Sequence, residues 1–200
     1  MNHSEKKFLN LRHMIQMAML GAVATVLMLF EIPLWFAPGF YEIDLSEVAV
    51  LVGTFAMGPV AGALIELIKV LLNFVLNGTI TAGVGELANL IIGCGLVVPA
   101  GIIYHRKKSM KTAVIGLITG ILVMTIIGST LNALVLLPAY SKAFHTPMEE
   151  LVAMGTAVNP AITDVKTFIM FAVAPFNLLK GVAVSVITML LYKKISPIFK

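Results

Sequence analysis

Long apolar runs separated by short polar segments are the feature that most constrains the fold of this chain. A run of about 20 apolar residues can cross the roughly 30 Å hydrocarbon core of a membrane as a helix, since an α-helix rises about 1.5 Å per residue. Of the 200 residues, 59% are hydrophobic and only 12% are charged. A soluble domain of this size cannot bury so much apolar surface, so the sequence predicts an all-α integral membrane protein.

We expect six transmembrane helices in a single membrane domain that covers residues 1–200. The second span is short, and Gly58-Pro59 separates it from the third, because Pro disfavours helical geometry at the residue before it. Fusion of 45–76 into one kinked helix would give five spans instead. The predicted spans are 14–30, 45–57, 60–76, 86–104, 112–137 and 166–192.

The basic residues support six spans over five. Six spans place 1–13, 58–59, 105–111 and 193–200 on one side of the membrane, and this side holds most of the Lys and Arg residues. Cytoplasmic segments are rich in Lys and Arg, so we expect both termini to lie in the cytoplasm. The net charge of +4 then reflects topology and contact with the lipid bilayer, not binding to nucleic acid. The basic residues on this side are Lys6, Lys7, Arg12, Arg106, Lys107, Lys108, Lys111, Lys193, Lys194 and Lys200.

Ionisable residues inside the spans are candidate functional groups, because burying a charge in the bilayer is costly. Glu66 and Lys69 are spaced i, i+3, so they can neutralise each other on one helix face; direct ligand contact is the alternative. Lys180 has no acid nearby in its own helix. It therefore either contacts a ligand or forms a long-range ion pair with Glu47 or Glu66.

The amides in the spans lie mostly toward the outer side. Asn73, Asn89 and Asn132 are near the outer ends of their predicted helices, and Asn177 shares a helix face with Lys180. The inner halves of the fourth and fifth spans carry almost no such groups. This asymmetry predicts a pocket that opens outward rather than a continuous pore. A plain interhelical hydrogen bond is an equally good interpretation of Asn132.

The loop 31–44 contains four aromatic residues beside two Pro and one Gly. One interpretation is an aromatic belt at the membrane interface, where Trp and Tyr commonly lie. The other is a lid of flat apolar groups over the outer pocket. The aromatic residues are Trp35, Phe36, Phe40 and Tyr41.

Motifs for nucleotide or metal chemistry are missing from the sequence. It has no G-x-x-x-x-G-K-[ST] and no H-E-x-x-H, and no two of its four His residues have metal-ligand spacing. A six-span intramembrane protease needs a Ser nucleophile and a His base within the membrane, and no His lies in a predicted span. We therefore expect no catalytic residues, no metal and no cofactor.

Four stretches resemble the riboflavin-binding S components of energy-coupling factor (ECF) transporters. They are YEIDLSEVAVLVGTFAMGPVAGALIELIKVLLNFVLNG, VGELANLIIG, STLNALVLLPAY and APFNLLKG. The resemblance implies the S-component fold and a substrate-binding subunit in the bacterial cell membrane that takes up riboflavin from outside. It also implies a transmembrane coupling subunit and two ATP-binding subunits as partners. Riboflavin is then the transported ligand and not a cofactor.

The same resemblance implies which residues bind. Asn132, Asn177 and Lys180 are expected to meet the polar edge of the isoalloxazine ring, since amides and an ammonium can pair with its carbonyl and imide groups. Glu47 and neighbours in the first loop, such as Tyr41, are expected to contact the ribityl chain. Asn89 and Lys69 are further candidates for the same site.

Ala18 and Ala22 resemble the small-residue AxxxA pattern on which S components dock their coupling subunit. Gly21 and Thr25 have the same spacing. Small residues four apart permit close helix approach, so packing within the chain is the alternative for both pairs.

Other ligands and functions remain possible at this point. Flavin mononucleotide is a secondary candidate, but only Lys142 and Lys166 lie in the outer loops to pair with a phosphate, which favours uncharged riboflavin. An S component for thiamin, biotin or folate is an alternative. A six-span membrane enzyme for proteolysis or lipid transfer is another, although no catalytic dyad is found.

Overall fold

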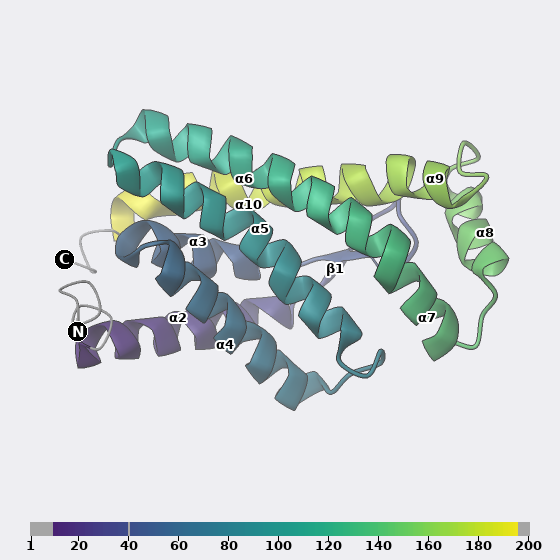
Figure 1. Cartoon of the computed structure of the whole chain (residues 1–200), viewed down its shortest axis with the longest axis horizontal. Helices are drawn as coiled ribbons and strands as arrows, with labels where there is room; N and C mark the ends of the chain where they lie inside the picture. Colours follow the sequence, from purple (N-terminus) through teal and green to yellow (C-terminus); the bar gives the residue numbers. More distant parts are fainter. Residues whose placement is uncertain (1–9, 40, 196–200) are drawn as a thin grey trace.

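The computed structural model describes residues 10–39 and 41–195, which form a helical bundle (Figure 1). Lys6, Lys7, Phe40 and Lys200, which appear in the expectations above, lie outside these residues. The helices are α2 (Leu11–Met28), α3 (Ser46–Met57), α4 (Pro59–Asn77), α5 (Val84–Arg106), α6 (Met110–Leu131), α7 (Leu137–Ala143), α8 (Met148–Val158), α9 (Val165–Phe168) and α10 (Ala174–Ile195), with π-helical segments η1 (Asn132–Leu136) and η2 (Ile169–Val173).

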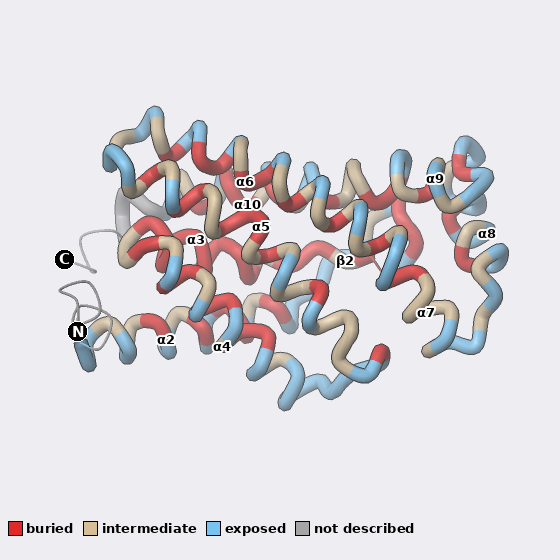
Figure 2. Tube along the Cα trace, viewed as in Figure 1, coloured by how far each residue is buried: buried red, intermediate tan, exposed pale blue. Residues whose placement is uncertain are grey.

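Five helical stretches in the described part are long and apolar enough to cross a membrane. The predicted second span is α3, an apolar helix of 12 residues and therefore only about 18 Å long. Its residues from Ser46 to Phe55 are all buried, and it packs on α2, α4, α5 and α10 (Figure 2). The short α3 thus occupies the centre of the bundle. The five long stretches are Leu11–Met28, Pro59–Asn77, Val84–Arg106, Met110–Ala143 and Val165–Leu191.

The break between α3 and α4 lies at the predicted position. Gly58 has a φ of +115°, a conformation that side chains rarely adopt, and Pro59 is the first residue of α4. The alternative of one fused helix over 45–76 is therefore wrong. The predicted separation of the third and fourth spans, 60–76 and 86–104, is also present, since residues 78–83 separate α4 from α5.

The fifth predicted span ends at residue 137, directly before Pro138, and this predicted helix end is wrong. The helix α6 continues through η1 into α7 and ends at Ala143. In η1 the N–H of Leu137 bonds to the carbonyl of Asn132, one residue further back than in an α-helix. Pro138 has no backbone N–H and cannot donate the usual helical hydrogen bond. The wider π turn just before it lets the helix continue through the proline. The segment η2 lies in the same way just before Pro175.

The chain is mostly helical, as predicted, but its first loop adds a pair of strands that was not predicted. The loop 31–44 contains two short antiparallel strands, β1 (Ile32–Pro33) and β2 (Glu42–Ile43). Ile32 pairs with Ile43, and Pro33 pairs with Glu42. This pairing closes the loop at its base and brings its second half back to the start of α3.

The elements are arranged so that basic segments share one end of the bundle. The start of α2, the α3–α4 junction, the α5–α6 connection and the end of α10 lie at the left in Figure 1. Helices α8 and α9 lie at the opposite end. The start of α2 carries the exposed Arg12, and the α5–α6 connection with its flanking residues carries the exposed Arg106, Lys107, Lys108 and Lys111.

Close packing of α6 on α5 depends on glycine. A Cβ atom at Gly120 would lie 2.3 Å from the backbone oxygen of Leu96, and one at Gly116 would lie 2.7 Å from that of Ala100. No real Cβ atom approaches a backbone oxygen so closely. These glycines therefore allow the two helix backbones to touch, as is common in membrane bundles.

We predict that Gly120→Ala destabilises the protein by about 1–3 kcal/mol, because the added methyl group forces α6 away from α5. Thermal unfolding in detergent should show a lower melting temperature. Gly39→Ala is the matched control, since nothing lies within 4 Å of a Cβ atom there. Equal melting temperatures for the two variants would contradict the role of Gly120.

Candidate ligand-binding pocket

A cavity of about 210 Å³ lies where the loop 31–44 meets the helices. Six of the seven candidate ligand-binding residues line it: Tyr41, Glu47, Asn89, Asn132, Asn177 and Lys180. They come from the loop, the start of α3, the start of α5, the end of α6 and α10. The cavity is therefore in the half of the bundle away from the basic end. The other lining residues are Met28, Glu31, Glu42, Asp44, Gly85, Ile92, Gly93, Met124, Leu136, Tyr140 and Phe176.

A second cavity of about 320 Å³ adjoins the first, and both are lined by Asn89, Glu31 and Tyr140. It extends toward the α4–α5 turn, where Asn73 and Asn77 line it. Asn73, one of the amides predicted near the outer side, therefore lies beside the main cavity rather than in it.

Two buried amides face the cavity from the π-helical regions. The Nδ2 of Asn132 donates to the carbonyl of Gly128 at 2.8 Å, and its Oδ1 accepts from the hydroxyl of Tyr41 at 2.6 Å. The Nδ2 of Asn177 donates to the carbonyl of Val173 at 2.9 Å. The side chain of Asn132 thus bonds to its own helix and to the loop, and it forms no interhelical hydrogen bond within the described part of the chain.

Lys180 forms an ion pair with Asp44, and neither predicted partner, Glu47 or Glu66, is correct. Its Nζ lies 2.8 Å from Oδ2 of Asp44. The other oxygen of Asp44 accepts the backbone N–H of Ser46 at 2.8 Å, at the beginning of α3. Asp44 is therefore a cavity residue that the sequence reasoning missed. Its place just before a helix was the available signal, since Asp commonly accepts helix N–H groups there.

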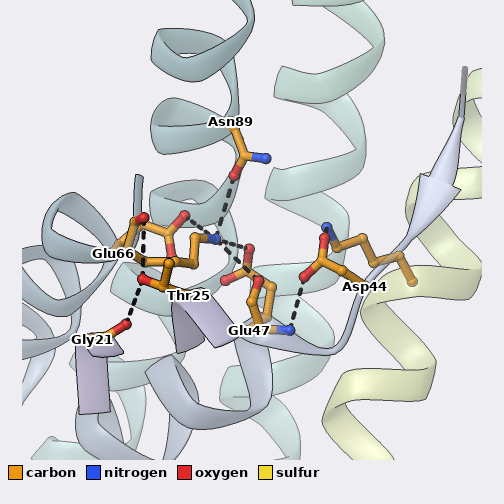
Figure 3. A network of polar contacts seen from close by, with 9 residues as sticks. Gly21, Thr25, Asp44, Glu47, Glu66 and Asn89 are labelled. Carbon is orange, nitrogen blue, oxygen red and sulfur yellow. Dashed lines mark hydrogen bonds and ion pairs between the residues drawn. The ribbon is translucent and has the colours of Figure 1, made fainter. Parts of the chain in front are cut away.

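Lys69 is the centre of a buried polar cluster behind the cavity (Figure 3). Its Nζ lies 2.7 Å from Oε1 of Glu66 and 2.8 Å from Oε1 of Glu47. It also donates to Ser46 Oγ at 3.3 Å and to Asn89 Oδ1 at 3.4 Å. The predicted pairing of Glu66 with Lys69 is confirmed. Lys69 itself is not among the residues that line either cavity.

The aromatic residues of the loop face different ways. Tyr41 is buried, and its ring centre lies 5.3 Å from that of Phe176 and 6.1 Å from that of Phe168. Trp35 is 84% exposed and contacts the ring of Phe36 edge-on. Only part of the loop therefore covers the cavity, and Trp35 is placed as an interfacial residue would be.

The cavity lining is acidic. Among the described residues that line it, the carboxylates are Glu31, Glu42, Asp44 and Glu47, whereas the one ammonium is that of Lys180. Partial burial, together with the neighbouring Glu42 carboxyl, raises the pKa of Glu31 to about 7. The described residues contain no group of three or more His, Cys, Asp and Glu that could hold a metal ion.

Ala18 and Ala22 lie on the outer face of α2, away from the cavity. Both are exposed, whereas Gly21 and Thr25 are buried. A Cβ atom at Gly21 would lie 2.4 Å from the side chain of Ile68 in α4, so this pair serves packing within the chain. The Ala18 and Ala22 pair is left free to contact another helix.

Comparison with known proteins identifies the family. The model of the family "ECF transporter, substrate-specific component" matches residues 12–192. The chain belongs to this family. The protein is therefore a component of a transporter and not an enzyme, as the sequence predicted. With five helical stretches of spanning length among residues 10–39 and 41–195, it is a multi-pass membrane protein.

Individual relatives agree with this assignment. The riboflavin transporter RibU of Staphylococcus aureus (strain TCH60) is 34% identical over 189 residues, which cover 94% of this chain and 93% of that protein. The riboflavin transporter FmnP of Bacillus subtilis (strain 168) is 30% identical and covers 94% of each chain. A solved S component of a bacterial ECF transporter is 34% identical, with a TM-score of 0.72 over 94% of this chain and 98% of that chain. The described residues thus adopt the S-component fold.

We predict that the ionisation of Glu31 lowers stability as pH rises. A carboxyl with a raised pKa holds its proton more tightly in the folded chain than in the unfolded chain. Its contribution is complete below the ordinary pKa of 4.5 and is lost as pH rises through about 7. The melting temperature in detergent should therefore fall more over this range for the wild-type protein than for Glu31→Gln.

Glu149→Gln is the control for this measurement, because Glu149 is an exposed carboxyl on α8 that does not line the cavity. Its pH profile should follow that of the wild-type protein. If Glu31→Gln also followed the wild-type profile, ionisation of Glu31 would have no effect on stability.

Proposed function

We propose that this S component binds riboflavin from the outer side of the bacterial cell membrane and delivers it to partner subunits for ATP-driven uptake. The observation that carries the proposal is the convergence of Tyr41, Glu47, Asn89, Asn132, Asn177 and Lys180 on one cavity. The named relatives are riboflavin transporters, which supports the same ligand and argues against thiamin, biotin or folate.

The chemistry of the cavity suits a flavin. Isoalloxazine is flat and largely apolar with one polar edge, and the rings of Tyr41 and Phe176 offer apolar faces. Asn132, Asn177 and Lys180 are assigned to the polar edge, because amides both donate and accept and an ammonium donates. Glu47, Asn89 and Tyr41 are assigned to the ribityl side.

The acidic lining favours an uncharged flavin. A phosphate would enter a cavity in which Lys180 is already paired with Asp44, and which Glu31 and Glu42 also line. Like charges in a partly buried site repel strongly, because the low dielectric does not screen them. Riboflavin is therefore proposed as the ligand in preference to flavin mononucleotide.

Topology and partners follow from the same assignment. The shared location of Arg12 and the basic α5–α6 connection at one end of the bundle supports cytoplasmic termini. With α3 counted as a short sixth span, the cavity then opens outward. A transmembrane coupling subunit and two ATP-binding subunits are the proposed partners, and the exposed Ala18 and Ala22 of α2 are the proposed docking face.

We predict that the purified chain retains a flavin, visible as a yellow absorption band that is released on denaturation. Lys180→Ala should weaken riboflavin binding about 10–100-fold, because a hydrogen bond from a charged group contributes about 1.5–3 kcal/mol. Quenching of riboflavin fluorescence measures the affinity. Lys142→Ala is the control, since Lys142 is exposed on α7 and does not line the cavity.

Unchanged affinity in Lys180→Ala would remove Lys180 from the site. A colourless wild-type protein that fails to quench riboflavin fluorescence would overturn the flavin assignment itself.

A second prediction concerns assembly. Ala22→Trp should block co-purification with the coupling subunit, because an indole at this position prevents close helix approach. Riboflavin binding by the isolated chain should be unchanged. Ile118→Trp, at an exposed position on α6, should assemble normally. Normal assembly of Ala22→Trp would contradict the docking face.

A further inference from the structure

We propose that Lys69 is a positioning residue for ligand recognition. Its ammonium holds Glu47 and Asn89 so that one free acceptor and one free donor group face the ribityl chain. This inference rests on the proposed riboflavin function, and it assigns to Lys69 a role other than direct ligand contact.

Lys69 has no hydrogen-bonding capacity left for a ligand. Its side chain is fully buried, and its ammonium contacts Glu47, Glu66, Ser46 and Asn89. An ammonium has three N–H donors, and the hydrogen bonds to Glu47, Ser46 and Asn89 use all three, while the contact with Glu66 is an ion pair. The partners lie on α3, α4 and α5, and in Figure 3 the side chains of Glu47, Glu66 and Asn89 converge from these helices.

Glu47 is left with one oxygen for the ligand. Its Oε1 is paired with Lys69, whereas its Oε2 is buried and has no hydrogen-bond partner in the described part of the chain. Glu47 lines the cavity and is only 2% exposed. Leaving a buried acceptor unsatisfied is costly, so a hydroxyl donor from a ligand would be favoured there.

Lys69 also orients the side chain of Asn89, which offers a donor group where Glu47 offers an acceptor. Its Oδ1 accepts from Lys69, which leaves the Nδ2 group as a donor on a residue that lines both cavities. A hydroxyl group both donates and accepts hydrogen bonds. A carboxylate acceptor on α3 and an amide donor on α5 are therefore a suitable pair for the hydroxyls of the ribityl chain.

Glu66 anchors the ammonium from the other side. It is fully buried, and it lies so close to α5 that a Cβ atom at Gly93 would be 2.2 Å from its Oε1. Glu66 does not line either cavity. Lys69 is thus fixed between the carboxylate of Glu47, which lines the cavity, and the carboxylate of Glu66, which does not.

Removing Lys69 alone would leave the carboxylates of Glu47 and Glu66 both buried and unpaired, which is strongly destabilising, so Glu66 is neutralised at the same time. The double variant Lys69→Met with Glu66→Gln removes one charge of each sign, so the net charge of the cluster is unchanged. Glu66→Gln alone keeps the contact of Lys69 with Glu47 and is the matched control. Affinities are measured for riboflavin and for lumiflavin, which has the ring but no ribityl chain.

We expect the double variant to bind riboflavin about tenfold more weakly while its affinity for lumiflavin stays within about twofold. Glu66→Gln should retain the preference for riboflavin. Glu47→Gln should cause a similar selective loss, and adding it to the double variant should cause little further loss, because Lys69 acts through Glu47.

If the double variant fails to fold, Lys69→Arg is a second variant, which keeps the positive charge. Its planar guanidinium cannot reproduce the ammonium contacts, so it should also lose riboflavin affinity selectively. Three results would overturn this inference but not the proposed function: equal losses of affinity for both ligands, an unchanged preference for riboflavin, or additive losses when Glu47→Gln is included. A wild-type protein that does not bind riboflavin would contradict the proposed function as well.

Discussion

The ammonium of Lys69 is the interaction on which the arrangement of the ligand-binding half depends. A buried charge is stable only when it is paired and hydrogen-bonded, and the partners of Lys69 lie on α3, α4 and α5. These three helices must therefore meet at one point. The short α3 is held at the centre of the bundle in consequence, with Glu47 at the cavity and Asp44 within reach of Lys180.

Departures from regular helix geometry lie where the cavity needs polar groups. Asn132 begins the π-helical segment η1, and Asn177 follows η2 and Pro175 by a few residues. Each amide donates to a carbonyl one turn earlier in its own helix, which orients the side chain. A Cβ atom at Gly128 would lie 2.9 Å from the amide of Asn177, so the absence of a side chain there makes room for this amide.

The sequence predicted most of the helices and six of the residues that line the cavity, but it missed Asp44 and did not predict how the charges pair. Glu66 and Lys69 were paired correctly because they are one helical turn apart. The partner of Lys180 is Asp44, 136 positions away, and no local rule connects them. The helix end assigned to Pro138 was wrong because a π turn in the folded bundle accommodates the proline.

The sequence by itself determined the apolar runs, the break at Gly58-Pro59, the basic segments and the small-residue pairs, because these depend on composition and spacing along the chain. Only the tertiary structure decided that α3 is buried, that Lys180 pairs with Asp44, and that Ala18 and Ala22 are exposed while Gly21 is packed against α4. These outcomes depend on which helix faces pack against each other. Because several helices have similar apolar faces, the sequence pattern alone does not specify which of them will be neighbours.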